Sequence, residues 1–397
     1  MTDISPRRID ALDILRGFVV MGIFLININY FSTPAIERYH PTVHGDFTGL
    51  NKWIWILSLT FVKQRLMMIF SVLFGAGLYL MSRSATALAK GPARTHYARM
   101  GWLLIFGLMH AYLIWNGDIL VTYAVCGAAV FFLRNLPARV LWGLSILLIL
   151  GPLLPDLPRL FAEREMSVDA LAWWNPDADA LSAARQANGG TWLEETPARF
   201  QVAFGRQTSG LWTFTLWRVS GLMLLGVLLI RNGFLAARLA RATYLKTLLI
   251  AGVPGAAVSL WGTWYYMDSG FDYFVFGREL TLAFQVGSLT LGTAYMAAMM
   301  LLVKSDGFTR LKRGLAALGR MAFTNYILQS VIGTLIFFGY GLGLFGLKSR
   351  TFLLAVCLTV WAVQMAGSVW WLNRFRFGPL EWVWRSLTYR QRQPWCL

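Results

Sequence analysis

Charged residues are scarce in this chain. Of 397 residues only 14% are Asp, Glu, Lys or Arg, whereas about a quarter of the residues of an ordinary soluble domain are charged. Hydrophobic residues make up 57%, and the chain holds 18 Trp and 27 Phe. Apolar runs of roughly 20 residues recur along the whole length, and each is long enough to cross a bilayer as a helix. The shortage of charge therefore excludes a single soluble core and indicates a polytopic membrane protein.

Cysteine and recognisable catalytic motifs are also lacking. The three cysteines, Cys126, Cys357 and Cys396, lie far apart and form no CxxC pair. This spacing excludes a disulfide framework, and we expect no metal site. The sequence has no Walker loop, no GxSxG elbow and no HExxH motif. The first apolar run is followed by no small-residue cleavage site, so we interpret it as a transmembrane helix and not as a signal peptide.

Negative charge is much rarer than positive charge. The net charge of +17 could suggest a nucleic-acid partner, but the basic residues fall in short clusters at alternate helix ends. That distribution is the positive-inside pattern of membrane proteins, and it favours anionic lipid headgroups as the partner. We therefore expect the lipid bilayer to be the partner, and no nucleic acid.

Hydropathy predicts an all-α polytopic membrane bundle of about ten transmembrane helices. One stretch is ambiguous, because Lys63, Gln64 and Arg65 interrupt it. It could be an interfacial helix followed by a span, or one long tilted span with a polar centre. The expected spans fall at 14–31, within 53–81, and at 100–115, 119–133, 140–154, 211–230, 247–266, 280–303, 321–345 and 352–372.

The longest polar stretch, residues 156–210, divides the spans into two blocks of five. It is net acidic within a basic protein, so we expect it to be a loop region on the external face. Residues 1–155 then form an N-terminal transmembrane block, and residues 211–397 form a C-terminal block with a basic tail. With this assignment the heavily basic loops share one side, which predicts that both termini are cytoplasmic. A homodimer is compatible with the sequence.

Ionisable groups inside a span cost several kcal/mol, so each is a functional candidate. Asp13 and Arg16 open the first helix. They could form an interface pair that suits the helix dipole, or Arg16 could clamp a phosphate or carboxylate. Asn27 and Asn29 lie near the other end of this helix. Interhelical hydrogen bonding explains them, and orienting a substrate carbonyl is the functional alternative.

Two of the four histidines, His40 and His44, lie within five residues of each other and next to Asp46. A histidine that a carboxylate orients is a general-base arrangement. A metal pair would need a helix, and Pro41 and Gly45 argue against one here. We therefore favour catalysis at this loop.

Other candidates lie deeper in the apolar sequence. His110 and Asp118 flank an Asn-Gly turn and could form a structural pair or a second catalytic pair. Lys63, Arg65 and Arg218 are basic residues within or beside apolar runs. They could anchor at the interface, or, if buried, bind an anionic group.

Several motifs resemble the YeiB-like family of bacterial integral membrane proteins. They are ALDILRGFVVMGIFLININ at 11–29, IFSVLFGAGLYL at 69–80, GLMHAYLIWNGDILVTYAVCG at 107–127, GRMAFTNYILQS at 319–330 and FGPLEWVWRSLTY at 377–389. The resemblance covers both ends of the chain and most of the spans. It implies a multi-pass protein of the bacterial inner membrane.

The LD-x-LRG opening also resembles integral membrane acyltransferases, including the heparan-α-glucosaminide N-acetyltransferase-like group. This resemblance implies transfer of an acyl group from cytoplasmic acyl-CoA to an acceptor outside. One branch has an Arg, ten residues and then a catalytic His in the first helix. Here Arg16 matches, but Asn27 stands at the second position. The glucosaminide branch has its active His in the loop after the first helix, where His40 is the nearest match and His44 a rival.

Three functions therefore compete. The first is acyl transfer, in which acyl-CoA (acetyl-CoA) is the donor, binding near Asp13, Arg16, Lys63 and Arg65, and a small molecule or glycan is the acceptor. One of the histidines would be the base, and Asn27, Asn29 or Arg218 would contact the substrate or the developing oxyanion. The second is a secondary transporter or channel for a small anionic solute. The third is a non-catalytic membrane scaffold.

Overall fold

The structure of the protein is a computed structural model that describes residues 10–43, 46–156, 158 and 165–397. Its described residues form helices and turns without a β-sheet, and Phe375 and Cys396 form an isolated β-bridge. The chain is thus an all-α polytopic membrane bundle, as the sequence predicts. The helical elements are α1 (Asp10–Ser32), η1 (Ile36–Arg38), α2 (Gly49–Leu57), η2 (Ser58–Val62), α3 (Arg65–Ser82), α4 (Ala85–Lys90), α5 (Pro92–Met109), η3 (His110–Ile114), α6 (Leu120–Leu133), α7 (Ala138–Leu150), η4 (Gly151–Asp156), α8 (Val168–Trp174), α9 (Ala178–Gln186), α10 (Thr196–Gly205), η6 (Arg206–Thr215), α11 (Leu216–Arg231), α12 (Arg241–Asp268), α13 (Tyr273–Val275), η7 (Phe276–Leu280), α14 (Thr281–Val303), α15 (Thr309–Arg320), α16 (Ala322–Phe337), α17 (Arg350–Leu372) and α18 (Pro379–Tyr389).

Among the described residues, six helical stretches are long and apolar enough to cross a membrane. They are Asp10–Ser32, Gly49–Ser82, Pro92–Ile114, Arg241–Asp268, Tyr273–Val303 and Arg350–Leu372. The pair Thr196–Trp212 and Leu216–Arg231 is bent by 67° and could form a seventh, broken span. Leu120–Leu133, Ala138–Leu154 and Ala322–Phe337 are shorter apolar helices. The count of ten spans and the cytoplasmic termini stay predictions.

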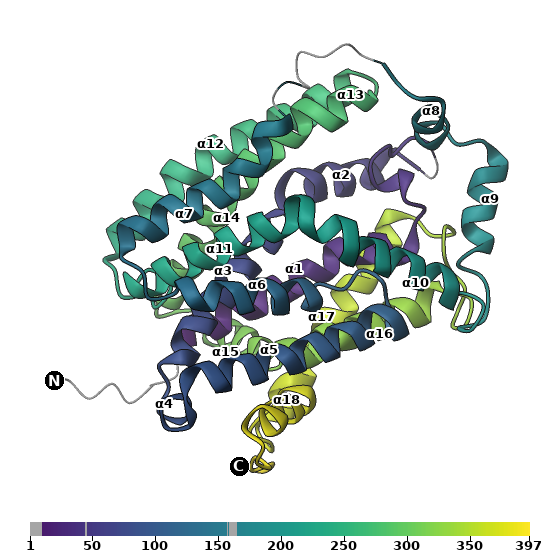
Figure 1. The fold of residues 1–397 in the computed structure, drawn as a ribbon. Coiled ribbons are helices and arrows are strands. Elements are labelled where there is room, and N and C mark those ends of the chain that lie inside the picture. The colour runs from purple at the N-terminus through teal and green to yellow at the C-terminus, as the bar shows by residue number, and fades with distance from the viewer. Residues whose placement is uncertain (1–9, 44–45, 157, 159–164) are drawn as a thin grey trace.

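The bundle has two chemically different ends. Figure 1 shows α4 and α18 at one end and α8, α9 and α13 at the other. We call the first the basic end, since α15 and α18 with the loops around α4 carry many of the basic residues. We call the second the loop end, and the predicted topology assigns it to the external side.

Helix α1 lies in the centre of the bundle and packs tightly on α15. An added Cβ at Gly17 would lie 2.0 Å from the Leu315 carbonyl oxygen, and one at Gly319 would lie 1.9 Å from the Asp13 carbonyl oxygen. Only glycine allows the two backbones to approach this closely. Val19, Ile69 and Val227 are fully buried where α1, α3 and α11 form the main core.

The ambiguous stretch around Lys63 is a helix broken in the middle. Helix α2 continues into the π-helix η2, and the chain then breaks at Lys63 and Gln64 before α3 begins. Gln64 has a φ of 67°, in the left-handed region. This break moves the Lys63 and Arg65 backbones out of one continuous helix, and their side chains point to different parts of the bundle.

Three sequence expectations about helices are wrong in detail. The span expected at 321–345 ends at Phe337, because Phe338 is extended and the glycine-rich turn that follows has positive φ at Gly343 and Gly346. Helices α15 and α18 were expected to be a loop and a tail. Both are amphipathic helices that bury a narrow stripe of small or apolar residues, so hydropathy does not reveal them.

Candidate functional site

A buried histidine–carboxylate pair lies at the loop end of α5. Helix α5 passes into the π-helix η3 at His110, and the chain reverses through Gly117, where an added Cβ would overlap the Trp115 ring at 2.2 Å. This reversal brings Asp118 back beside His110. His110 Nδ1 lies 2.8 Å from Asp118 Oδ1, and the two side chains are only 1% and 2% exposed. The second Asp118 oxygen accepts the Val121 N–H at 2.8 Å and so caps α6.

The pair leaves one histidine nitrogen unused. His110 Nε2 is buried and has no hydrogen-bond partner among the described residues, and the buried Tyr326 hydroxyl lies close to the Ile119 backbone. The two rings lie 5.2 Å apart between centroids. In the neutral imidazole, a hydrogen bond from Nδ1–H to Asp118 would leave the lone pair on Nε2. The π-helical turn η3 ends this helix, and the dyad begins at its first residue, His110.

Arg16 lies at the basic end, beside other cations. Its NH1 is 3.0 Å from Asp13 Oδ1, and the Asp13 side chain is nearly buried. Arg16 and Arg385 are close enough to Arg99 for their charges to interact, and the Arg99 guanidinium lies 3.9 Å from the Trp384 ring centroid. Helix α18 therefore completes a basic cluster with α1 and α5.

Glu381 attaches α18 to the start of α16. Its carboxylate accepts the Phe323 N–H at 2.7 Å and the Thr324 hydroxyl at 2.6 Å. Burial raises the pKa of Glu381 above its usual value. The hydrogen bonds hold α18, and with it Arg385, against the bundle.

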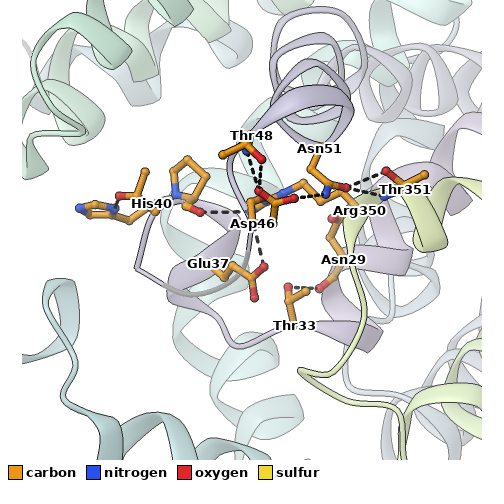
Figure 2. A network of polar contacts seen from close by, with 11 residues as sticks. Asn29, Thr33, Glu37, His40, Asp46, Thr48, Asn51, Arg350 and Thr351 are labelled. Carbon is orange, nitrogen blue, oxygen red and sulfur yellow. Dashed lines mark hydrogen bonds and ion pairs between the residues drawn. The ribbon is translucent and has the colours of Figure 1, made fainter.

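The loop after α1 is organised by Asp46 and Arg350 (Figure 2). Asp46 accepts hydrogen bonds from the Thr48 backbone and from the Asn51 amide at 2.7 Å, and so begins α2. Hydrogen bonds from Thr48 and then Asn51 lower the pKa of Asp46. Arg350 donates to the Asp46 carbonyl at 2.9 Å and pairs with Glu37 at 3.5 Å.

His40 points away from Asp46 in Figure 2. Its Nδ1 lies 3.1 Å from the Thr42 hydroxyl, and its ring packs on Trp174 and Phe271. Partial burial lowers the pKa of His40. The described residues thus form no His40–Asp46 dyad, and His44 lies outside the described residues.

The two asparagines of α1 occupy different positions. The Asn29 amide donates to the Leu25 carbonyl at 3.1 Å, and Asn29 lines a pocket at the loop end. Asn27 is half-buried. It lies three helical turns from Arg16, so both share one face of α1.

Two fully or nearly fully buried arginines have no ion pair with any described carboxylate. Arg65 donates to the Ser259 hydroxyl at 2.8 Å and to the Lys63 carbonyl at 2.6 Å, whereas Arg218 donates to the Ser288 hydroxyl. Arg65 Nε and Arg218 NH1 are buried without a partner in the described chain. Lys63 is not part of this group of buried cations. Its ammonium lies over the Tyr39 ring, and Lys63 lines the loop-end pocket.

Sequence reasoning missed three residues that belong to these sites. Tyr326 lies on α16, more than 200 positions from His110, so no local pattern connects them. Arg38 and Arg350 come to line the same pocket only in the folded chain. The sequence does single out Arg350, because it is a basic residue at the end that the charge pattern assigns to the external side, where basic residues are few.

Comparisons with known proteins place the chain in a family. A family model described as "Protein of unknown function (DUF418)" matches residues 229–391. The uncharacterized protein YeiB of Escherichia coli (strain K12) is 31% identical over 405 residues, covering 97% of each chain. The chain belongs to the YeiB-like family. The uncharacterized protein YxaH of Bacillus subtilis (strain 168) is 29% identical, covering 98% of this chain and 96% of YxaH.

A third relative is an uncharacterized 39.9 kDa protein of Bacillus acidopullulyticus, 28% identical over 98% of this chain and 95% of its own length. No solved structure matches the chain. The family resemblance drawn from the motifs is thus confirmed along nearly the whole length. The alignments with YeiB and YxaH cover nearly all of the chain and so span the segments that hold His110, Asp118 and Tyr326.

Proposed function

We propose that the chain is a transmembrane acyltransferase of the bacterial inner membrane. It moves an acyl group, expected to be acetyl, from cytoplasmic acyl-CoA to a hydroxyl or amine acceptor at the external face. The observation that supports this best is the buried His110–Asp118 pair, whose Nε2 has no hydrogen-bond partner among the described residues and whose ring lies 5.2 Å from the Tyr326 ring, centroid to centroid. A histidine oriented in this way is the usual general base for activating an acceptor.

The chemistry at the dyad is as follows. His110 Nε2 takes the proton of the acceptor, whose oxygen or nitrogen attacks the thioester carbonyl. The new C–O or C–N bond forms, the C–S bond breaks, and the proton passes from His110 to the departing thiolate. Asp118 stabilises the imidazolium, and the Tyr326 hydroxyl donates to the developing oxyanion.

The donor would enter at the basic end. Arg16, Arg99 and Arg385 provide cations for the phosphates of CoA, and the Arg16 fork suits bidentate binding. We expect Arg16→Lys to weaken acyl-CoA binding and Arg16→Ala to abolish it. Unchanged binding in a well-expressed Arg16→Ala protein would reduce Arg16 to an interface residue that pairs with Asp13.

The direct test uses the purified protein in liposomes with radiolabelled acetyl-CoA. Acyl transfer by this route predicts release of free CoA and label in an acceptor, both dependent on the protein. Intact acetyl-CoA after incubation with an acceptor extract, under conditions where the protein binds acetyl-CoA, would reject the activity.

A second candidate function, transport of a small anion, has its own support. Arg65 and Arg218 are buried in the bundle without a described carboxylate partner, and isolated buried cations are costly unless an anion joins them. Uptake of a labelled anion into liposomes, lost in Arg218→Gln and without CoA release, would favour transport over acyl transfer.

A further inference from the structure

A pocket at the loop end combines cations with apolar walls. It lies between α1, η1, α2, η2 and the start of α17. Arg38, Lys63 and Arg350 supply three cations, and Glu37 is the one carboxylate among the described residues that line it. Glu37 already pairs with Arg350, and Arg350 also donates to the Asp46 carbonyl. Arg38 and Lys63 therefore form no ion pair among the described residues, and Glu37 acts on Arg38 only through its charge.

Arg38 and Lys63 contact aromatic faces and no acid. The Arg38 guanidinium lies 4.4 Å from the Tyr30 ring centroid, and the Lys63 ammonium lies 4.3 Å from the Tyr39 ring centroid. Neither forms an ion pair with a residue in the described parts of the chain, and Arg38 Nε is buried without a hydrogen-bond partner there. The two side chains are close enough for their charges to repel.

The rest of the pocket is apolar and borders the lipid-facing surface. Leu25, Ile54 and Leu354 are among its lining residues. On the same helices, Trp53 and Leu57 of α2 and Leu358 of α17 are large, apolar and more than half exposed. In a membrane bundle such exposed side chains face the acyl chains of lipids.

We propose that this pocket binds an anionic phospholipid, with the headgroup phosphate between Arg38 and Lys63 and an acyl chain along the apolar wall of α2 and α17. The phosphate removes the repulsion between the two cations and supplies oxygen acceptors for their N–H groups. The apolar wall distinguishes a lipid from a soluble phosphate. This inference does not depend on acyl transfer, because binding is measured without acyl-CoA.

The test is native mass spectrometry of the purified full-length protein in detergent, with phosphatidylglycerol or phosphatidylcholine added. We expect retention of phosphatidylglycerol and not of phosphatidylcholine. Each neutralised cation should weaken retention about fivefold, so Arg38→Gln with Lys63→Gln should lose most of the bound lipid. Lys52→Gln is the matched control, since Lys52 is on α2 at the same end and outside the pocket lining.

A second variant keeps the cations and fills the wall. Leu354→Trp should lower phosphatidylglycerol retention. The degree to which inorganic phosphate competes with the lipid should stay unchanged, because the two cations are still present. This variant tests the pocket even if the double variant does not fold. Equal retention of both lipids, or wild-type retention in the double variant, would overturn the proposal. Complete displacement of the lipid by millimolar inorganic phosphate would also overturn it, because the ligand would then be a soluble anion.

Discussion

Glu195 is a carboxylate that the fold keeps away from water at the loop end. It immediately precedes α10 and is 5% exposed, and its Oε1 has no partner among the described residues. Burial raises the pKa of Glu195 to about 7, although a hydrogen bond from Gly339 and the charge of Arg199 favour the ionised form. The folded protein therefore holds the proton more tightly than the unfolded chain does. Stability from this group is present at acidic pH and is lost as the pH rises from the unfolded pKa through about 7.

We therefore predict that Glu195→Gln raises the thermal midpoint at pH 8 and changes it little at pH 4.5, since the glutamine resembles the neutral acid. Glu194 is the matched control. It is exposed, and the Thr191 N–H and hydroxyl lower its pKa, so its stabilisation exists at neutral pH and is lost on acidification. Glu194→Gln should lower the midpoint at pH 8. A thermal midpoint of Glu195→Gln that lies below the wild-type midpoint at pH 8, but not at pH 4.5, would contradict this assignment.

At the residue scale, the sequence can predict contacts between side chains that are close along the chain. It does not predict contacts between side chains that are far apart in the sequence. His110 and Asp118 could be proposed together because the Asn-Gly turn between them reverses the chain. His40 and Asp46 are also close in sequence, yet Asp46 hydrogen-bonds Thr48 and Asn51 instead, as a short acidic side chain before a helix commonly does. Tyr326 and Arg38 required the tertiary structure.

The close contact between α1 and α15 gives a prediction at the scale of elements. An added methyl at Gly319 would collide with the Asp13 carbonyl, whereas an added methyl at Gly101 has no atom within 4 Å. Gly319→Ala should therefore lower the free energy of unfolding by about 1–3 kcal/mol, since the two backbones must separate. Gly101→Ala should be neutral or slightly stabilising, because alanine favours the helix.

The measurement is thermal unfolding of both variants in the same detergent. Because Asp13 and Arg16 lie at this contact, Gly319→Ala should also weaken acyl-CoA binding if Arg16 binds the donor. Equal stability of Gly319→Ala and Gly101→Ala would mean that α1 and α15 are not held together at this point.

Hydropathy predicts the long apolar helices well and their ends poorly. Helices α1, α6 and α17 agree with the expected spans to within a few residues. The break at Gln64 and the end of α16 depend on backbone conformations that tertiary packing imposes. Helix α15 buries Gly314, Leu315 and Leu318 on one side only, so its average composition is that of a polar loop.

At the scale of the whole molecule, the charge difference between the two ends predicts the orientation. In intact cells, single cysteines at Lys90, Arg238 and Lys312 should be shielded from an impermeant thiol reagent, and cysteines at Asp177 and Asp272 should react. The background variant needs Cys396→Ser, because Cys396 is exposed, whereas Cys126 and Cys357 are buried. Labelling at Lys312 but not at Asp177 would reverse the orientation and, with it, the direction of the proposed transfer.

Composition and charge thus predict the fold class and the membrane environment, and the resemblance of the motifs predicts the family. The proposed acyl transfer would depend on the shape of interior surfaces contributed by α1, η3 and α16, which no local pattern of residues encodes. The central claim concerns one atom on those surfaces, His110 Nε2.

The most direct measurement is the rate of acyl transfer from labelled acetyl-CoA by His110→Ala in liposomes, beside wild type and His40→Ala. The proposed role as general base predicts that His110→Ala loses about 10²–10⁴ in rate while still binding acetyl-CoA. Asp118→Asn should lose an intermediate amount, and His40→Ala should stay within a few-fold of wild type because His40 contacts Thr42 and aromatic rings only among the described residues. A wild-type rate in His110→Ala, or a large loss in His40→Ala alone, would contradict the assignment.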